Sequence, residues 1–216
     1  MAALSAAAAV IGLSFGAIAT ASGLPAWAVV TMSGLVFAGG SQFMAVGMLA
    51  VGSPVAAILG GLLLNARHLP FGLAIADVLA GTHPARRLVG AHLLIDESAA
   101  FALAQTDARR RAAAYWLTGG SLFVCWNTGT LVGVLLGAAV GDPMVFGLDA
   151  AFPAALIALL LPRLREPAGL RVAAVGGALA VATTFVLPAG LPVLVALVGL
   201  LAAGRAARPI AEGASR

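Results

Sequence analysis

The chain has 216 residues, of which 62% are hydrophobic and 9% charged, and its formal net charge is +4. A soluble domain carries about 25% charged residues, so this composition excludes an ordinary soluble protein and predicts a single all-α, polytopic membrane domain over residues 1–216. The basic residues are all arginines and lie in short segments between apolar runs, which argues against nucleic acid as a partner. A single cysteine excludes an intrachain disulfide and a cysteine-based metal site, and we expect no cofactor.

The start of the chain predicts a spanning helix followed by a second apolar helix. The first 66 residues contain no charged side chain, and the apolar run over residues 2–21 has the length of about 20 residues that crosses a bilayer. Gly12 and Gly16 are four residues apart and predict a face that another helix can approach closely. A Gly-Leu-Pro turn then leads into a helix expected over residues 25–38.

Two consecutive glycines, Gly39 and Gly40, follow that helix and precede Ser41 and Gln42. Glycine adopts conformations that end a helix, and a helix broken at membrane depth presents backbone groups that need partners. We therefore expect a break at the two glycines and expect these four residues to bind a solute. The chain then continues as an apolar segment over residues 41–51.

The first charged side chain, Arg67, interrupts an apolar stretch over residues 55–77. An arginine near the bilayer centre costs roughly 2.5–3.5 kcal/mol, so it persists only with a partner or beside a water-filled cavity. If the stretch is one helix, Asn65 and His68 lie three residues apart on one face. The alternative is a helix end from which Arg67 reaches the lipid headgroups.

Two basic loops, residues 81–87 and 106–112, are expected on the cytoplasmic side of the membrane. The apolar run between them, residues 88–104, is too short to cross the membrane twice. We therefore expect this run to be a re-entrant or interfacial segment.

That run contains three titratable residues, His92, Asp96 and Glu97. His92 and Asp96 are spaced i, i+4 and would face each other on one helix, whereas Glu97 lies about 100° further around it. Two acids in an apolar segment favour a proton or cation site, and Arg67 is the natural counter-ion. The alternative is an interfacial helix whose carboxylates are hydrated.

A long helix is predicted over residues 112–140. Glycines recur at every fourth position, which predicts a stripe for close helix packing: Gly129, Gly133, Gly137 and Gly141. Trp126 and Asn127, near the middle of this helix, are candidates to line a substrate path. A hydrogen bond between helices explains Asn127 equally well.

The last third of the chain predicts apolar helices over residues 146–162, 168–187 and 191–203. A basic loop at residues 163–171 is expected in the cytoplasm. Counting spans of about 20 residues together with the broken or re-entrant segments, we expect about six to eight helices.

Three segments of the chain form a combined pattern: Phe-Ala-Gly-Gly-Ser-Gln-Phe at residues 37–43, Asn-Ala-Arg-His-Leu-Pro-Phe-Gly at 65–72, and Ile-Asp-Glu-Ser-Ala-Ala-Phe-Ala at 95–102. Together they resemble the AzlC family of branched-chain amino-acid permeases. They occur in the family's order and at about its spacing, and a long glycine-rich helix follows them. Ile95 and Phe71 depart from the threonine and tyrosine that are usual in the family.

The resemblance implies an exporter of branched-chain amino acids in the bacterial inner membrane. It also implies a small hydrophobic partner subunit of the AzlD type. The lipid bilayer and the amino-acid substrate complete the expected partners, and a homo-oligomer is left open.

These residues admit a mechanism as a hypothesis. Backbone groups at the break, with Ser41 and Gln42, would hold the amino and carboxyl groups of a zwitterion. Arg67 would pair with Asp96 or Glu97 in one state and with the substrate in another. Protonation of the acid would couple export to the proton gradient, because burial raises the pKa of a carboxyl group. A purely structural role for Arg67 explains its presence equally well.

Two other classes of function are weighed against transport. An intramembrane enzyme would use His68 or His92 with Asp96 as a general acid–base pair, although the sequence contains no zinc-protease helix motif and no G-x-S-x-G elbow. A membrane scaffold would rely on the glycine stripe and would tolerate Asp96→Asn.

Overall fold

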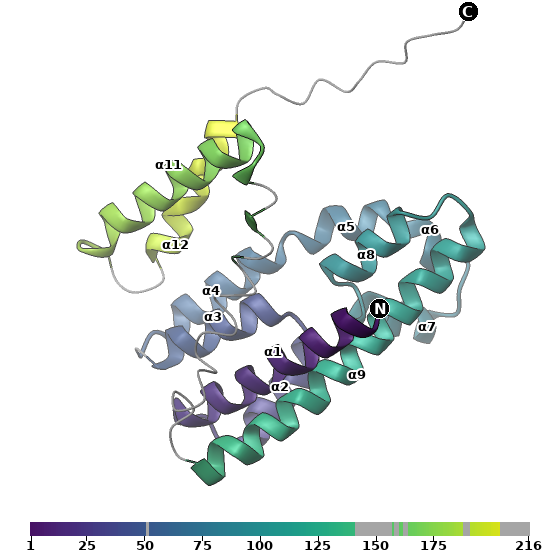
Figure 1. The fold of residues 1–216 in the computed structure, drawn as a ribbon, viewed down its shortest axis with the longest axis horizontal. Coiled ribbons are helices and arrows are strands. Elements are labelled where there is room, and N and C mark those ends of the chain that lie inside the picture. Colours follow the sequence, from purple (N-terminus) through teal and green to yellow (C-terminus); the bar gives the residue numbers. More distant parts are fainter. Residues whose placement is uncertain (51, 141–156, 158–159, 162–163, 188–190, 204–216) are drawn as a thin grey trace, which may run out of the picture. The chain divides into compact units, whose positions relative to one another are not determined.

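The computed structural model describes residues 1–216 except 51, 141–156, 158–159, 162–163, 188–190 and 204–216, and every regular element in the described part is a helix (Figure 1). Four described stretches are long and apolar enough to span a membrane: Ala2–Ala21, Pro54–Ala74, Ala108–Ala139 and Pro167–Thr184. The prediction of an all-α polytopic membrane protein is confirmed. The chain divides into two compact units, Met1–Ala154 and Ala155–Arg216. A single domain over the whole chain stays a prediction.

The frame of the first unit is the contact between α1 (Ala2–Ala21) and α9 (Ala108–Val140), which lie side by side in Figure 1. A methyl group on Gly133 would collide with the carbonyl oxygen of Leu13, and one on Gly137 would lie 3.0 Å from that of Ala17. The contacting residue numbers increase together along the two helices, so α1 and α9 run parallel.

The other glycines of this contact follow the same order. Gly129 meets the backbone of Ala9, while Gly12 and Gly16 of α1 meet the backbone of α9 at Trp126 and Thr130. Because neither helix carries a side chain at these positions, the two backbones touch directly. This gives the van der Waals packing that associates helices in lipid. The fourth glycine of the predicted stripe, Gly141, lies outside the described residues.

A polar contact joins α2 (Ala26–Val36) to α9. The hydroxyl of buried Ser33 lies 2.9 Å from Asn127 Oδ1 and 3.1 Å from Thr130 Oγ1, and Asn127 Nδ2 donates to the carbonyl oxygen of Phe123 at 2.9 Å. Hydrogen bonds of this kind between membrane helices contribute about 0.6 kcal/mol on average. The structure therefore shows Asn127 in the interhelical hydrogen bond that the sequence left as an alternative.

Between α2 and α9 the chain forms six shorter helices: α3 (Gly39–Ala50), α4 (Pro54–Asn65), α5 (His68–Ala74), α6 (Ala76–Leu79), α7 (Pro84–His92) and α8 (Asp96–Leu103). The run over residues 88–104 is divided between α7 and α8, neither of which is long enough to cross a bilayer. The prediction of a re-entrant or interfacial segment fits this division.

The two basic stretches predicted as loops, residues 81–87 and 106–112, are partly helical, because α7 begins at Pro84 and α9 begins at Ala108. Asp107 Oδ1 accepts a hydrogen bond of 2.8 Å from the backbone N–H of Arg110, so α9 begins at Ala108 and includes the arginines. Arg111 donates to the carbonyl oxygen of Ala74 at 2.6 Å, and its Nε lies 3.5 Å from Asp77 Oδ2. These contacts attach the start of α9 to the end of α5 and to α6.

The described part of the second unit consists mainly of apolar helices. α11 (Pro167–Thr184) packs against α12 (Leu191–Ala196) and the 3₁₀-helix η2 (Leu197–Ala203), with Gly176 and Gly199 at the closest approach. The predicted basic loop at 163–171 ends by Glu166, because Pro167 occupies the first position of α11. Most of the helix predicted over 146–162 lies outside the described residues.

The glycine contact makes a prediction that two substitutions on one helix can test. Gly133→Ala places a methyl group against the α1 backbone, whereas Gly120, also on α9, has nothing within 4 Å of such a methyl group. We expect Gly133→Ala to destabilise the protein by about 1–3 kcal/mol through overpacking. Gly120→Ala should have little effect. Thermal unfolding in detergent measures both, and equal midpoints for the two variants would contradict the described contact.

Candidate functional site

The first interruption of a helix lies between α2 and α3, at Phe37 and Ala38. Phe37 has φ 42° in the left-handed region, which costs a non-glycine residue roughly 1–2 kcal/mol. The predicted break at Gly39 and Gly40 is therefore wrong by two residues, since both glycines belong to the first turn of α3. Gly39 serves packing instead: a side chain there would begin 3.0 Å from the ring of Trp126.

Polar side chains of α3 close this break. Ser41 Oγ donates to the carbonyl oxygen of Ala38 at 2.8 Å, and Gln42 Oε1 accepts from the backbone N–H of Ala38 at 3.1 Å. Gln42 is only 1% exposed, yet its Nε2 has no hydrogen-bond partner among the described residues. The first N–H groups of a helix and the last carbonyls of the helix before it also lack partners within their own helices. The break therefore offers hydrogen-bond donors from α3 and acceptors from α2.

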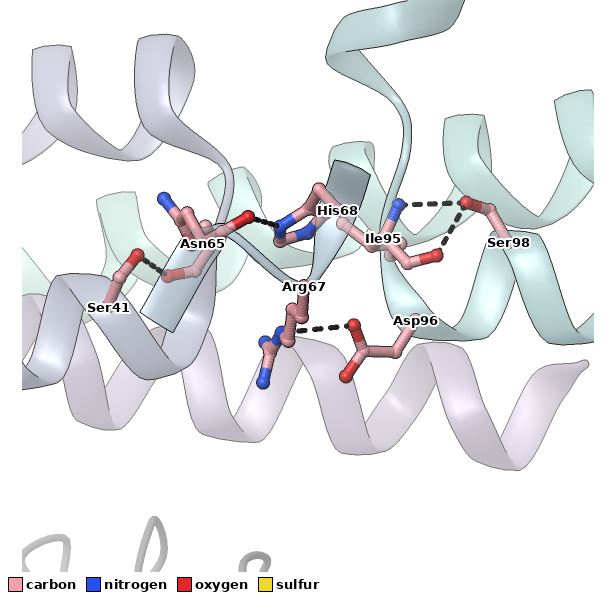
Figure 2. A network of polar contacts seen from close by, with 8 residues as sticks. Ser41, Asn65, Arg67, His68, Ile95, Asp96 and Ser98 are labelled. Carbon is pink, nitrogen blue, oxygen red and sulfur yellow. Dashed lines mark hydrogen bonds and ion pairs between the residues drawn. The ribbon is translucent and has the colours of Figure 1, made fainter. Parts of the chain in front are cut away.

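The second interruption, at Ala66 and Arg67, separates α4 from α5. His68 Nδ1 donates to the backbone carbonyl oxygen of Asn65 at 2.9 Å. Asn65 Oδ1 is buried and has no partner in the described part of the chain. Figure 2 shows the consequence of the turn: His68 is directed toward Asn65, whereas Arg67 extends toward α8.

The third interruption lies between α7 and α8, at residues 93–95. Ser98 Oγ accepts from the backbone N–H of Ile95 at 3.0 Å and donates to the carbonyl oxygen of Leu93 at 2.9 Å. His92 ends α7 and Asp96 begins α8, so the prediction that these two residues face each other on one helix is wrong. His92 packs instead against the rings of Phe37 and Phe123.

Asp96 pairs with Arg67 across the second and third interruptions (Figure 2). Asp96 Oδ1 lies 3.2 Å from Arg67 Nε, without the alignment of a hydrogen bond, so this contact is an ion pair. The two side chains are 40% and 44% exposed. Glu97, the next residue of α8, interacts electrostatically with Arg67 and His68. The counter-ion expected from the sequence is therefore in place.

All three interruptions contribute to one cavity of about 190 Å³. Residues from the end of α2, the α4–α5 turn and the end of α7 form its wall: Val36, Phe37, Ala38, Asn65, His68, Ala91, His92 and Leu94. Ligand pockets for drug-sized molecules measure about 300–1,000 Å³, so this cavity suits a smaller solute. The wall combines apolar side chains with two imidazoles and one amide.

The cavity departs in part from the residues selected on sequence. Asn65 and His68 line it, whereas Trp126 stacks on Phe15 at a centroid distance of 5.9 Å and is mostly buried in the core. Sequence reasoning missed Phe37 as a wall residue and paired His92 with the wrong partner. Phe37 is the first residue of the segment 37–43, and its place in that segment could have indicated a role at the site.

The fold, with four described stretches able to span a membrane, defines a multi-pass membrane protein. The family model described as "AzlC protein" matches residues 3–140, and the chain belongs to the AzlC family. It is 31% identical over 187 residues to the inner membrane protein YgaZ of Escherichia coli, covering 82% of this chain and 76% of that protein. It is 32% identical over 178 residues to an uncharacterized membrane protein of Archaeoglobus fulgidus, covering 80% and 76%. No solved structure matches the chain.

The ion pair makes a prediction for a double-mutant cycle. Arg67→Gln and Asp96→Asn each leave one charge without its partner, so each should lower the thermal unfolding midpoint. The double variant should be more stable than the sum of the single effects predicts, by about 1 kcal/mol.

Arg87→Gln combined with Asp96→Asn provides the matched control, because exposed Arg87 makes no ion pair with Asp96. This second pair of substitutions should be additive. Additive effects for Arg67 and Asp96 as well would contradict the pairing.

Proposed function

We propose that the protein exports branched-chain or other small apolar amino acids across the inner membrane. The observation that supports this proposal is the meeting of three helix interruptions at one cavity of about 190 Å³. Helix interruptions at membrane depth persist where they line a polar cavity, and transporters place substrate sites at such broken helices.

The groups around the break between α2 and α3 suit a zwitterion. The N-terminus of α3 carries the positive end of the helix dipole and the amide nitrogen of Gln42, which favour a carboxylate. The carbonyl end of α2 and the Oδ1 of Asn65 favour an ammonium group, and neither Gln42 Nε2 nor Asn65 Oδ1 has a partner within the described ranges. The aliphatic wall residues Val36, Ala91 and Leu94 would receive an apolar side chain.

The ion pair between Arg67 and Asp96 would couple transport to the proton gradient. Protonation of Asp96 removes the negative charge that holds Arg67, and deprotonation restores it. In this cycle the second and third interruptions are held together by the ion pair in one state and are not held together by it in the other. Glu97, the next residue of α8, is the second acid that would hold Arg67 in the other arrangement.

The family resemblance also supports a partner, a small hydrophobic subunit of the AzlD type. A non-transporting scaffold remains the main competing class. It depends on the packing of α1 and α9 and requires neither an acid at position 96 nor a cavity. The two classes therefore differ in their response to Asp96→Asn.

Efflux of preloaded radiolabelled leucine, isoleucine and valine tests the proposal in cells that carry the chain with or without the small subunit. We expect efflux that a protonophore abolishes and that Asp96→Asn reduces at least about tenfold, equivalent to roughly 1.4 kcal/mol. Asp77→Asn is the matched control, because Asp77 pairs with Arg111 and does not line the cavity. No efflux of any of the three amino acids, with or without the subunit, would contradict the exporter.

A further inference from the structure

Three aromatic rings from three different elements meet at the wall of the cavity. Phe37, at the first interruption, lies 5.0 Å between ring centroids from Phe123 of α9 and 6.1 Å from His92 of α7. His92 and Phe123 lie 5.4 Å apart, so each ring touches the other two. Phe37 and His92 line the cavity, and Phe123, which does not line it, packs against both rings.

The backbone conformation at Phe37 favours glycine, so the presence of phenylalanine at this position needs an explanation. Its φ of 42° is a conformation that glycine adopts freely and that other residues adopt at a cost of roughly 1–2 kcal/mol. The turn alone would therefore be served better by glycine. Phe37 is only 5% exposed, and its edge-to-face contact with Phe123 offsets the cost of the turn. Compared with glycine, phenylalanine at position 37 adds an aromatic ring to a residue that lines the cavity.

The size of the cavity shows what this ring excludes. A cavity of about 150 Å³ holds one benzene molecule. The present cavity of about 190 Å³ has an open side, so the wall at Phe37 limits only the part of a substrate that lies against it. Removal of the Phe37 ring would free the space of about one such ring next to the existing volume.

We propose that Phe37, held by His92 and Phe123, is the residue that sets the upper limit on the size of the substrate side chain. This inference rests on the proposed amino-acid transport and concerns selection at the same cavity. It predicts that the protein binds leucine in preference to phenylalanine because of the Phe37 ring.

Competition experiments with the purified full chain and its small subunit in proteoliposomes test this inference. Radiolabelled leucine is displaced by unlabelled alanine, leucine or phenylalanine. In Phe37→Gly, which permits the positive φ and removes the ring, leucine should bind less tightly and phenylalanine more tightly. The preference for leucine over phenylalanine should fall at least about tenfold, within the range by which pockets discriminate side-chain size. Phe37→Trp should shift the preference toward alanine.

Phe101→Ala is the control for loss of a phenylalanine ring, because Phe101 lies on α8, is 40% exposed and does not line the cavity. It should keep the wild-type preference. If thermal unfolding shows that Phe37→Gly is not folded, Phe37→Leu replaces it, and its preference should shift in the same direction by a smaller factor.

The outcomes separate this inference from the proposed function. Leucine binding with an unchanged preference in a folded Phe37 variant overturns the inference and leaves transport in place. Failure of the wild-type protein to bind any of the three amino acids overturns both.

Discussion

The constraint on which this structure depends is that backbone N–H and C=O groups need partners wherever water is absent. A helix can stop at membrane depth only where side chains or a polar cavity replace its hydrogen bonds. Ser41 and Gln42 do this for the first interruption, and Ser98 does it for the third. Gln42 Nε2 and Asn65 Oδ1, which have no hydrogen-bond partner among the residues that the structure describes, are the reason to look for a bound solute at these interruptions.

The long helix α9 contacts both α1 and the first interruption. Its glycines bring it into backbone contact with α1, and a few residues earlier it supplies the two aromatic side chains that support the first interruption. Trp126 lies against Gly39, and Phe123 lies against Phe37. The packing of α1 and α9 therefore also fixes one wall of the candidate site, and a change in this packing would reach the cavity through these two rings.

Sequence patterns predicted the features that depend on composition and spacing. The spans follow from apolar length, and Arg67 pairs with Asp96 because few counter-ions exist in an apolar segment. The positions of the interruptions were harder to predict, since they depend on tertiary contacts. Trp126 favours a glycine at position 39 without requiring a break there, and the edge-to-face contact with Phe123 helps to hold Phe37 in the left-handed conformation. The helical start at Ala108 could have been predicted from Asp107 as an N-cap.

The central claim is that three separate interruptions form one binding site. Hydrogen–deuterium exchange of the full chain with its small subunit, with and without saturating leucine, tests it most directly. Peptides covering residues 36–43, 64–69 and 91–98 should all gain protection together, while peptides from α11 (Pro167–Thr184) should exchange unchanged. Protection confined to one interruption, or found only outside all three, would contradict a shared site.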